Sequence, residues 1–202
     1  IADCGDPYYN NTVDTFKHPF YFKYIEKWMF KKTDYISIPT VGAIDAYFKE
    51  FHPKIKIIPQ GFDLSRSSKK SYTKNKIPTF AYAGGLSTKG IRNPFKLLNA
   101  LREIDQDYEF HIYTGSGYSL LINRINDSRI VLHKAIPRRK LLIQLAKMDF
   151  LVNFDNLTEL MSPSKLIDYA ITERPVLNIN ANDPDVDRLK KFMNGDYSDK
   201  YD

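Results

Sequence analysis

The sequence predicts an α/β fold in which helices cover both faces of parallel sheets. Short apolar runs alternate with amphipathic stretches along almost the whole chain, and the runs Phe80-Ala81-Tyr82-Ala83 and Phe150-Leu151-Val152 are nearly uniformly apolar. Such alternation implies right-handed crossovers, and such runs are typical of parallel strands buried on both faces. Strands are expected at residues 1–4, 35–38, 55–58, 79–83, 109–113, 129–132, 150–154 and 176–179, and helices near 21–31, 42–51, 94–104, 119–125, 138–147, 164–172 and 185–193.

The pattern breaks at a serine-rich basic stretch that contains Arg66, Lys69, Lys70, Lys74 and Lys76. Three strands precede it, too few for a doubly wound domain, and five follow it. The expected organisation is therefore the end of a truncated first Rossmann-like domain at residues 1–61, a basic linker at 62–78 and a second Rossmann-like domain at 79–202. A single eight-stranded domain is the structural alternative.

The 202 residues carry a net charge of +6. A basic balance fits nucleic acid, an anionic membrane or a phosphorylated small molecule. No nucleic-acid-binding motif accompanies the basic stretch, so nucleic acid is not expected as a partner. The stretch is either a solvated linker or a peripheral contact with an anionic membrane. The single cysteine, Cys4, fits a reducing cytoplasm, and the strand-like start at Ile1 suggests that the chain begins inside a larger protein.

Two glycine turns follow expected strands. Gly84-Gly85 comes after the strand at 79–83, with Lys89 a few residues further on, and Gly115-Ser116-Gly117 comes after the strand at 109–113. Glycines allow a close approach between backbone and ligand, and a lysine can neutralise a phosphate. Ordinary glycine turns after strands are the alternative at both places.

A third segment has the features of an anion site at the start of a helix. Ser162 is a good N-cap and Pro163 suits the first helical position. Free amides there, with Ser164 and Lys165, favour a phosphate. Asp168 lies further along the same helix, where its carboxylate could accept hydrogen bonds from ribose hydroxyls; the alternative is an ordinary capped helix with Asp168 on its solvated face.

Three other patterns are expected to be structural. The four histidines are scattered without metal-ligand spacing, so no metal is expected. Asp183-Pro184-Asp185 resembles a metal-binding Asp-x-Asp, but Asp and Pro also begin helices, and we expect them to begin the last one. The aromatic-rich stretch at 21–30 is expected to be helix core rather than a ligand platform.

The order of these segments resembles retaining glycosyltransferases of the GT-B fold, most closely glycosyltransferase family 4. Ile58-Pro59-Gln60-Gly61-Phe62-Asp63 is similar to the hinge of that family, with Gln60 in place of asparagine. The glycine turns and Lys89-Gly90 follow in the family's order. Ala146-Lys147-Met148-Asp149 resembles its helix-to-strand step, and Glu173-Arg174-Pro175-Val176 resembles its "glycine-x-proline-valine" ending.

The resemblance implies a role for each candidate residue. Lys89 would contact the donor diphosphate and contribute to catalysis, and Ser162, Ser164 and Lys165 would cradle the same group. Asp168 would take the place of the glutamate that binds ribose. Gly84, Gly85, Gly115 and Gly117 would line the nucleotide pocket, and the backbone at residues 135–136 would contact the base.

Two positions depart from the family. Gly85 stands where the family has a diphosphate-binding arginine, and Leu160 stands where it has the first acid of a glutamate pair, so that the neighbouring Glu159 becomes the candidate catalytic carboxylate. The resemblance implies metal-independent sugar transfer from a nucleotide-sugar to a saccharide or lipid-linked acceptor in polysaccharide assembly, without a cofactor. A non-catalytic nucleotide-sugar-binding module and a doubly wound regulatory domain unrelated to sugars are the alternatives.

Overall fold

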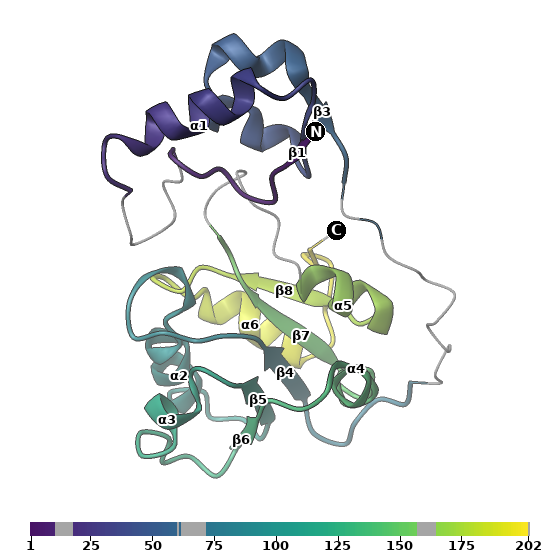
Figure 1. Cartoon of the computed structure of the whole chain (residues 1–202). Coiled ribbons are helices and arrows are strands. Elements are labelled where there is room, and N and C mark those ends of the chain that lie inside the picture. The colour runs from purple at the N-terminus through teal and green to yellow at the C-terminus, as the bar shows by residue number, and fades with distance from the viewer. Residues whose placement is uncertain (11–17, 60, 62–71, 157–164, 202) are drawn as a thin grey trace. The chain divides into compact units, whose positions relative to one another are not determined.

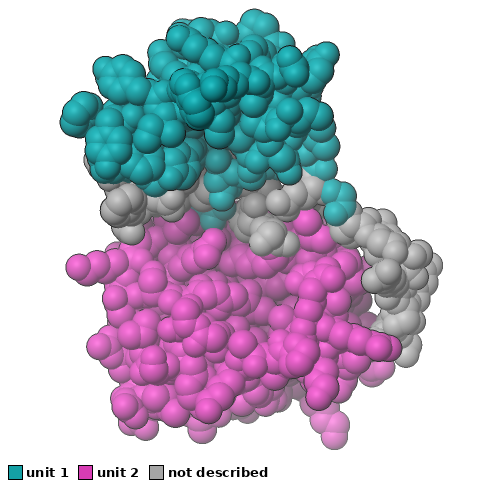
Figure 2. Space-filling view, viewed as in Figure 1, with its two compact units in different colours: residues 1–63, 156–163 teal, residues 64–155, 164–202 magenta. Residues whose placement is uncertain are grey.

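The computed structural model describes residues 1–10, 18–59, 61, 72–156 and 165–201 (Figure 1). The chain divides into two compact units, residues 1–63 with 156–163 and residues 64–155 with 164–202 (Figure 2). Each unit contains one parallel sheet, of three strands in the first and five in the second. The single eight-stranded domain is therefore excluded.

The smaller unit is built on three parallel strands. β1 (Ala2–Asp3), β2 (Ile36–Ile38) and β3 (Ile55–Ile57) pair in that order, and α1 (Phe22–Lys31) connects the first two. Its core consists of apolar side chains from the sheet, the helix and the turns between β2 and β3: Phe30, Ile36, Ile38, Ala43, Tyr47 and Phe51.

The expected helix at 42–51 was wrong. The segment forms two 3₁₀ turns, η1 (Val41–Ala46) and η2 (Lys49–Lys54), separated by extended backbone at Tyr47. Tyr47 and Phe51 are both buried against the sheet. Tertiary packing of these rings therefore overrides the helical pattern, whose propensity Gly42 already weakens.

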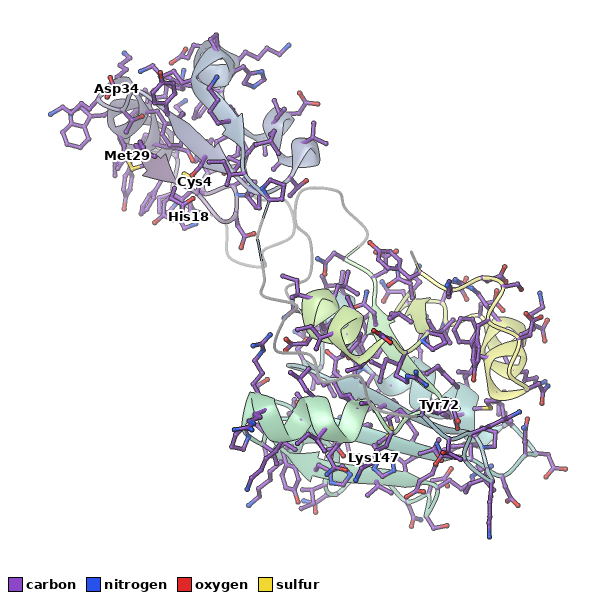
Figure 3. The ribbon with its side chains drawn as sticks, turned by 90° about the vertical axis from the view of Figure 1, so that its right-hand side faces the viewer. Cys4, His18, Met29, Asp34, Tyr72 and Lys147 are labelled. Carbon is purple, nitrogen blue, oxygen red and sulfur yellow. The ribbon has the colours of Figure 1, made fainter. Side chains whose placement is uncertain are left out.

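The expectation that the aromatic stretch at 21–30 is helix core was also largely wrong. Phe30 is buried, but Tyr24, Trp28 and Met29 on α1 are 59%, 60% and 40% exposed. Met29 is labelled in Figure 3. The face of α1 that is buried is instead marked by Phe30 and by Glu26, whose burial raises the pKa of its carboxyl.

The larger unit is a doubly wound sheet with strand order β6-β5-β4-β7-β8. The chain starts in the middle with β4, adds β5 and β6 on one side, and then returns to add β7 and β8 on the other. The strand order reverses between β4 and β7, which is where open parallel sheets bind ligands. The strands are β4 (Thr79–Ala83), β5 (Glu109–Thr114), β6 (Ile130–Lys134), β7 (Phe150–Phe154) and β8 (Val176–Ile179).

Helices cover both faces of this sheet (Figure 1). One face packs against α2 (Phe95–Arg102), α3 (Tyr118–Leu121) and α6 (Val186–Met193), and the other against α4 (Arg138–Leu145) and α5 (Lys165–Thr172). These helices bury alternate side chains of the strands, so Phe80 and Tyr82 enter one core and Ala81 and Ala83 the other.

Two helix ends explain sequence patterns. Asp185 caps α6 by accepting a hydrogen bond from the Arg188 backbone N–H at 3.0 Å, so the expected structural role of Asp183-Pro184-Asp185 is confirmed at that residue. Glu173, just past α5, has a left-handed φ of 57°. This conformation favours glycine at helix C-termini. Glycine is also the residue at this position in the family that the sequence resembles.

Asp149 holds the beginning of the sheet together. Its carboxylate accepts hydrogen bonds from the backbone of Thr79 at 2.7 Å and of Asn75 at 3.2 Å, and from the Tyr72 hydroxyl. Figure 3 labels Tyr72 and Lys147, whose carbonyl accepts from the Asn75 amide at 3.0 Å. The described end of the expected linker, residues 72–78, is thus fastened to the start of β4, and Asp149 has a structural role.

All eight expected strands are present, and their ends lie within two residues of the expected positions. The predicted fold class, parallel Rossmann-like sheets with helices on both faces, is confirmed. Among the described helices none combines the length and the apolar composition that crossing a membrane requires.

Candidate functional site

The two glycine turns lie at the carboxyl end of the larger sheet, beside the point where the strand order reverses. Gly84 follows β4 directly and Gly115 follows β5 directly. The backbone N–H of Gly84 donates to the carbonyl of Tyr113 at 3.0 Å, so the ends of the two strands remain paired up to the turns. The sequence therefore placed both turns correctly at the edge of the sheet where ligands bind.

Three of these glycines lie where an added Cβ would be closer than ordinary van der Waals contact. A Cβ on Gly117 would lie 2.6 Å from the Leu86 Cβ, and a Cβ on Gly85 would lie 3.2 Å from the Ser116 Oγ. Gly84 has a φ of 152°, and a Cβ there would lie 2.9 Å from the Tyr82 hydroxyl. Packing against Leu86 of the other turn accounts for Gly117, and the Tyr82 hydroxyl together with the backbone conformation accounts for Gly84, before any ligand is considered.

Lys165 brings a positive charge to the first glycine turn. It begins α5, its Cδ lies 3.7 Å from the position that a Cβ on Gly84 would occupy, and its Nζ lies 4.5 Å from the centre of the Tyr82 ring. Burial is the larger cause and repulsion from Arg92 the smaller one, and together they lower the pKa of Lys165 to about 7. A half-buried ammonium group that is disfavoured by its surroundings provides a strong attraction for an anion.

Tyr82 and Arg92 were not identified from the sequence. Tyr82 is the fourth residue of β4, and its hydroxyl donates to the Gly85 carbonyl at 2.8 Å, which orients the turn. The alternation of β4 marks Tyr82 as core, and only its hydroxyl distinguishes it from the other buried rings. Arg92 ends the short 3₁₀ turn Gly90–Arg92, and its carbonyl accepts from the Ser87 N–H at 3.1 Å.

Lys89 lies in the same loop as the first glycine turn and is exposed. Its carbonyl accepts a hydrogen bond from the Ser87 hydroxyl at 2.5 Å, which orders the backbone around it. Within the described residues, its ammonium group makes no hydrogen bond or ion pair. The loop therefore presents Lys89 to solvent, and no contact joins it to Lys165.

Asp168 has a partner. Its Oδ1 accepts a hydrogen bond from Arg138 Nε at 2.7 Å and forms an ion pair with Arg138 Nη2 at 2.6 Å. The Asp168 side chain is 23% exposed and that of Arg138 is 62% exposed, so the pair lies at the surface of the unit. Arg138 begins α4 immediately after Ala135-Ile136-Pro137, and Ala135 adjoins the second glycine turn, because a Cβ on Gly115 would lie 3.6 Å from its Cβ.

Tyr169, the residue after Asp168, fixes α5 to the sheet. It is fully buried, and its hydroxyl accepts a hydrogen bond from the Ala83 backbone N–H at 2.9 Å and donates toward the Val152 carbonyl at 3.1 Å. β4 and β7 pair only at Phe80 and Ala81 with Phe150 and Leu151. The hydroxyl thus bridges the two strands where their own pairing has ended.

Several expected site residues lie outside the described residues. They are Gln60 and Phe62 of the hinge, the candidate carboxylate Glu159 with Leu160, and Ser162, Pro163 and Ser164 before α5. The described part of the site consists of the turns after β4 and β5, the loop after β6 and the first turn of α5, which carry Gly84, Gly85, Lys89, Gly115, Gly117, Lys165 and Asp168.

Two of the histidines form a structural pair. His111 Nδ1 and His133 Nε2 are hydrogen-bonded at 2.8 Å across β5 and β6, and the Tyr113 ring stacks on His133 with 4.3 Å between centroids. Burial lowers the pKa of both imidazoles. His111 Nε2 also lies 3.2 Å from the Glu109 carboxylate, so the pair has protein partners on β5 and β6.

The sequence matches no family model, and no curated protein matches it. Solved structures do match. One is the apo form of WaaB, a lipopolysaccharide outer core galactosyltransferase, with a TM-score of 0.61 and 14% identity over 82% of this chain and 54% of that one. Another is TarM, with a TM-score of 0.61 and 15% identity over 88% of this chain and 35% of that one.

These neighbours are glycosyltransferases of the GT-B fold, and the chain has the fold of a truncated portion of them. It spans about half the length of one and about a third of the other. The predicted likeness to the GT-B fold is thereby confirmed at the level of fold.

Proposed function

We propose that the chain binds the nucleotide-sugar donor of a metal-independent glycosyltransferase, which transfers a sugar with retention of configuration in polysaccharide assembly. The observation that carries the proposal is the position of Lys165. Its half-buried ammonium group lies beside the glycine turn after β4, at the point where the strand order reverses. A diphosphate bound there would neutralise Lys165 and occupy the ligand position typical of such sheets.

The chemistry requires stabilisation of negative charge on the leaving diphosphate. Lys165 and the amino-terminal end of α5 would supply it, and Lys89 would add a second cation from the exposed loop. Asp168 would bind the ribose, and the backbone of the loop after β6 would contact the nucleotide base. We also propose that Glu159 is the carboxylate that faces the donor sugar. It would take the role of the acid that the family has at the position occupied here by Leu160.

A panel of ligands in thermal unfolding tests the proposal. Nucleoside diphosphates and nucleotide-sugars are expected to raise the unfolding temperature of the chain, because a ligand at 100 times its Kd stabilises the folded state by about 2.7 kcal/mol. The matching nucleosides at equal concentration should stabilise it less, since they lack the group that Lys165 attracts. Stabilisation by none of the diphosphates of uridine, guanosine, adenosine or cytidine would contradict the proposal.

A non-catalytic nucleotide-sugar-binding module is the second candidate function. Gly85 favours it, because the position has no side chain to offer a diphosphate. The two candidates differ in turnover: the module would bind nucleotide-sugars in the full-length protein without consuming them. A regulatory domain unrelated to sugars would show no preference for diphosphates over nucleosides.

The acceptor that we propose is a saccharide or lipid-linked saccharide. We propose that the protein reaches it through a peripheral contact with an anionic membrane on the cytoplasmic side. Support comes from α1, where exposed rings and lysines share one surface: Trp28 and Tyr24 are 60% and 59% exposed, and the Lys32 Nζ lies 4.2 Å from the Trp28 ring centre. Aromatic rings beside lysines are typical of membrane interfaces.

This contact predicts that the chain co-sediments with vesicles containing phosphatidylglycerol and not with vesicles of phosphatidylcholine alone. Removing the charges of Lys31 and Lys32 together should reduce the bound fraction, because each lysine near an anionic surface contributes about 1 kcal/mol. The matched control removes Lys190 and Lys191, which lie on α6 of the other unit. An equal loss from both double variants would contradict a contact through α1.

A further inference from the structure

The ion pair between Arg138 and Asp168 joins two parts of the proposed nucleotide site. Arg138 is the first residue of α4 and follows the loop after β6 directly, whereas Asp168 lies in the first turn of α5. The helices pack side by side on one face of the sheet through Leu145, Tyr169 and their apolar neighbours. The pair therefore links the loop proposed for the base to the residue proposed for the ribose.

The geometry leaves one carboxylate oxygen available. Arg138 Nε, which donates a hydrogen bond at 2.7 Å, and Arg138 Nη2, in an ion pair at 2.6 Å, both contact Asp168 Oδ1. Within the described residues, Oδ2 accepts no hydrogen bond. Since an ionised carboxylate can accept at both oxygens, Oδ2 retains its capacity for a ligand hydroxyl while Oδ1 is held.

The pair contributes little to folding. The Arg138 side chain is 62% exposed, and exposed ion pairs contribute little to stability, because solvent screens the charges and two long side chains lose rotational freedom. Its two converging donors do restrict rotation of the Asp168 carboxylate, which as an aspartate has a short side chain whose reach depends on its orientation. The effect of the pair should therefore be seen in ligand recognition and not in stability.

We propose that Arg138 is a positioning residue for nucleotide selection: it holds Asp168 so that Oδ2 accepts hydrogen bonds from the ribose hydroxyls. This inference rests on the proposed function, because it requires a nucleotide at the site. It goes further in assigning the selection of ribose over deoxyribose to a pair of residues on different helices. An arginine that had to be displaced by the ribose would have the opposite effect on affinity.

The test measures the Kd of UDP, GDP and ADP and of their 2′-deoxy forms for the wild-type chain and for Arg138→Ala. The variant is expected to lose most of the preference for ribose, about a three- to tenfold weakening of the ribonucleotide, with little change for the deoxynucleotide. Asp168→Asn should lose the same preference, because an amide has one acceptor oxygen. The double variant should lose no more than either single variant, since the two residues act as one unit.

Two controls separate positioning from general effects. Arg139→Ala removes the same charge from the neighbouring exposed position and should keep the ribose preference. Arg138→Lys keeps the charge without the two-pronged donor and should restore only part of the preference. Unfolding temperatures of all variants should stay close to that of the wild type.

Each other outcome overturns the inference in a recognisable way. An unchanged ribose preference in Arg138→Ala would make the pair an ordinary surface interaction, and tighter ribonucleotide binding would make Arg138 a competitor of the ribose. A wild-type chain that binds diphosphates without preferring ribose would refute the roles of Asp168 and Arg138 and leave the phosphate site intact. A wild-type chain that binds none of these nucleotides would refute the proposed function together with this inference.

Discussion

Replacing Lys165 by methionine is expected to weaken the binding of nucleoside diphosphates about ten- to a hundredfold. The reason is the loss of a charge-assisted hydrogen bond, which contributes roughly 1.5–3 kcal/mol to binding. Binding of the matching nucleoside should change little. Methionine keeps an unbranched side chain against the Tyr82 ring, over which the Lys165 Nζ lies at 4.5 Å. The substitution therefore removes the charge and retains most of the packing.

The same substitution should stabilise the fold at neutral and lower pH. The pKa of Lys165 is lowered to about 7 in the folded chain, against about 10.4 in an unfolded one. Between these values the unfolded chain binds the extra proton, so wild-type stability rises with pH from about 7 to about 10. Lys165→Met should remove this rise, and at pH 6, where the wild type buries a charged lysine, the variant should melt at the higher temperature.

Unfolding temperatures at pH 6 and pH 9, with the Kd of UDP, GDP and ADP at pH 7, measure both effects. Lys190→Met, at an exposed position of α6, is the control for loss of one charge. A Lys165→Met variant that binds diphosphates as tightly as the wild type would remove the observation on which the proposed function depends.

Replacing Gly117 by alanine should destabilise the larger unit by about 1–3 kcal/mol, the usual cost of forcing an extra methyl group into a packed region. The new Cβ would lie 2.6 Å from the Leu86 Cβ and 3.0 Å from the Thr114 Oγ1. Leu86 is only 5% exposed and belongs to the core, so it cannot move without shifting the turn at Gly84-Gly85. Diphosphate binding should therefore fall together with stability.

Gly115→Ala is the matched control in the same turn, because its Cβ would lie at an ordinary 3.6 Å from the Ala135 Cβ. Chemical denaturation should show a small effect for this variant and a large one for Gly117→Ala. Equal effects would mean that the contact between the two turns does not determine which glycine is required.

The sequence predicted the larger sheet well because its signals were local. The strands expected at 79–83 and 150–154 are mostly apolar, with Thr79 and Asn153 as the polar exceptions, and the structure has strands with those bounds. The prediction of a helix at 42–51 was wrong because the helical pattern competed with the burial of Tyr47 and Phe51. That burial depends on the rest of the small sheet. The prediction that the aromatic stretch at 21–30 is helix core was largely wrong because residue type alone does not decide which rings are buried.

The candidate site was predictable only in its positions along the chain. Glycines after strands and a lysine and an aspartate near the start of a helix can be found from order and spacing. The pairing of Asp168 with Arg138 could not, because these residues lie thirty positions apart on different helices. Likewise, a buried strand residue such as Tyr82 gives no sign in the sequence that its hydroxyl will orient the neighbouring turn.

The hydroxyl of Tyr169 has a consequence for how this protein can vary. Because it bridges Ala83 and Val152, the position of α5 is fixed to the two central strands. Substitutions on the exposed face of α5 should therefore leave Lys165 and Asp168 at the same height above the sheet. One buried side chain would thus let the outer surface of the helix vary while the proposed nucleotide contacts on α5 stay in place.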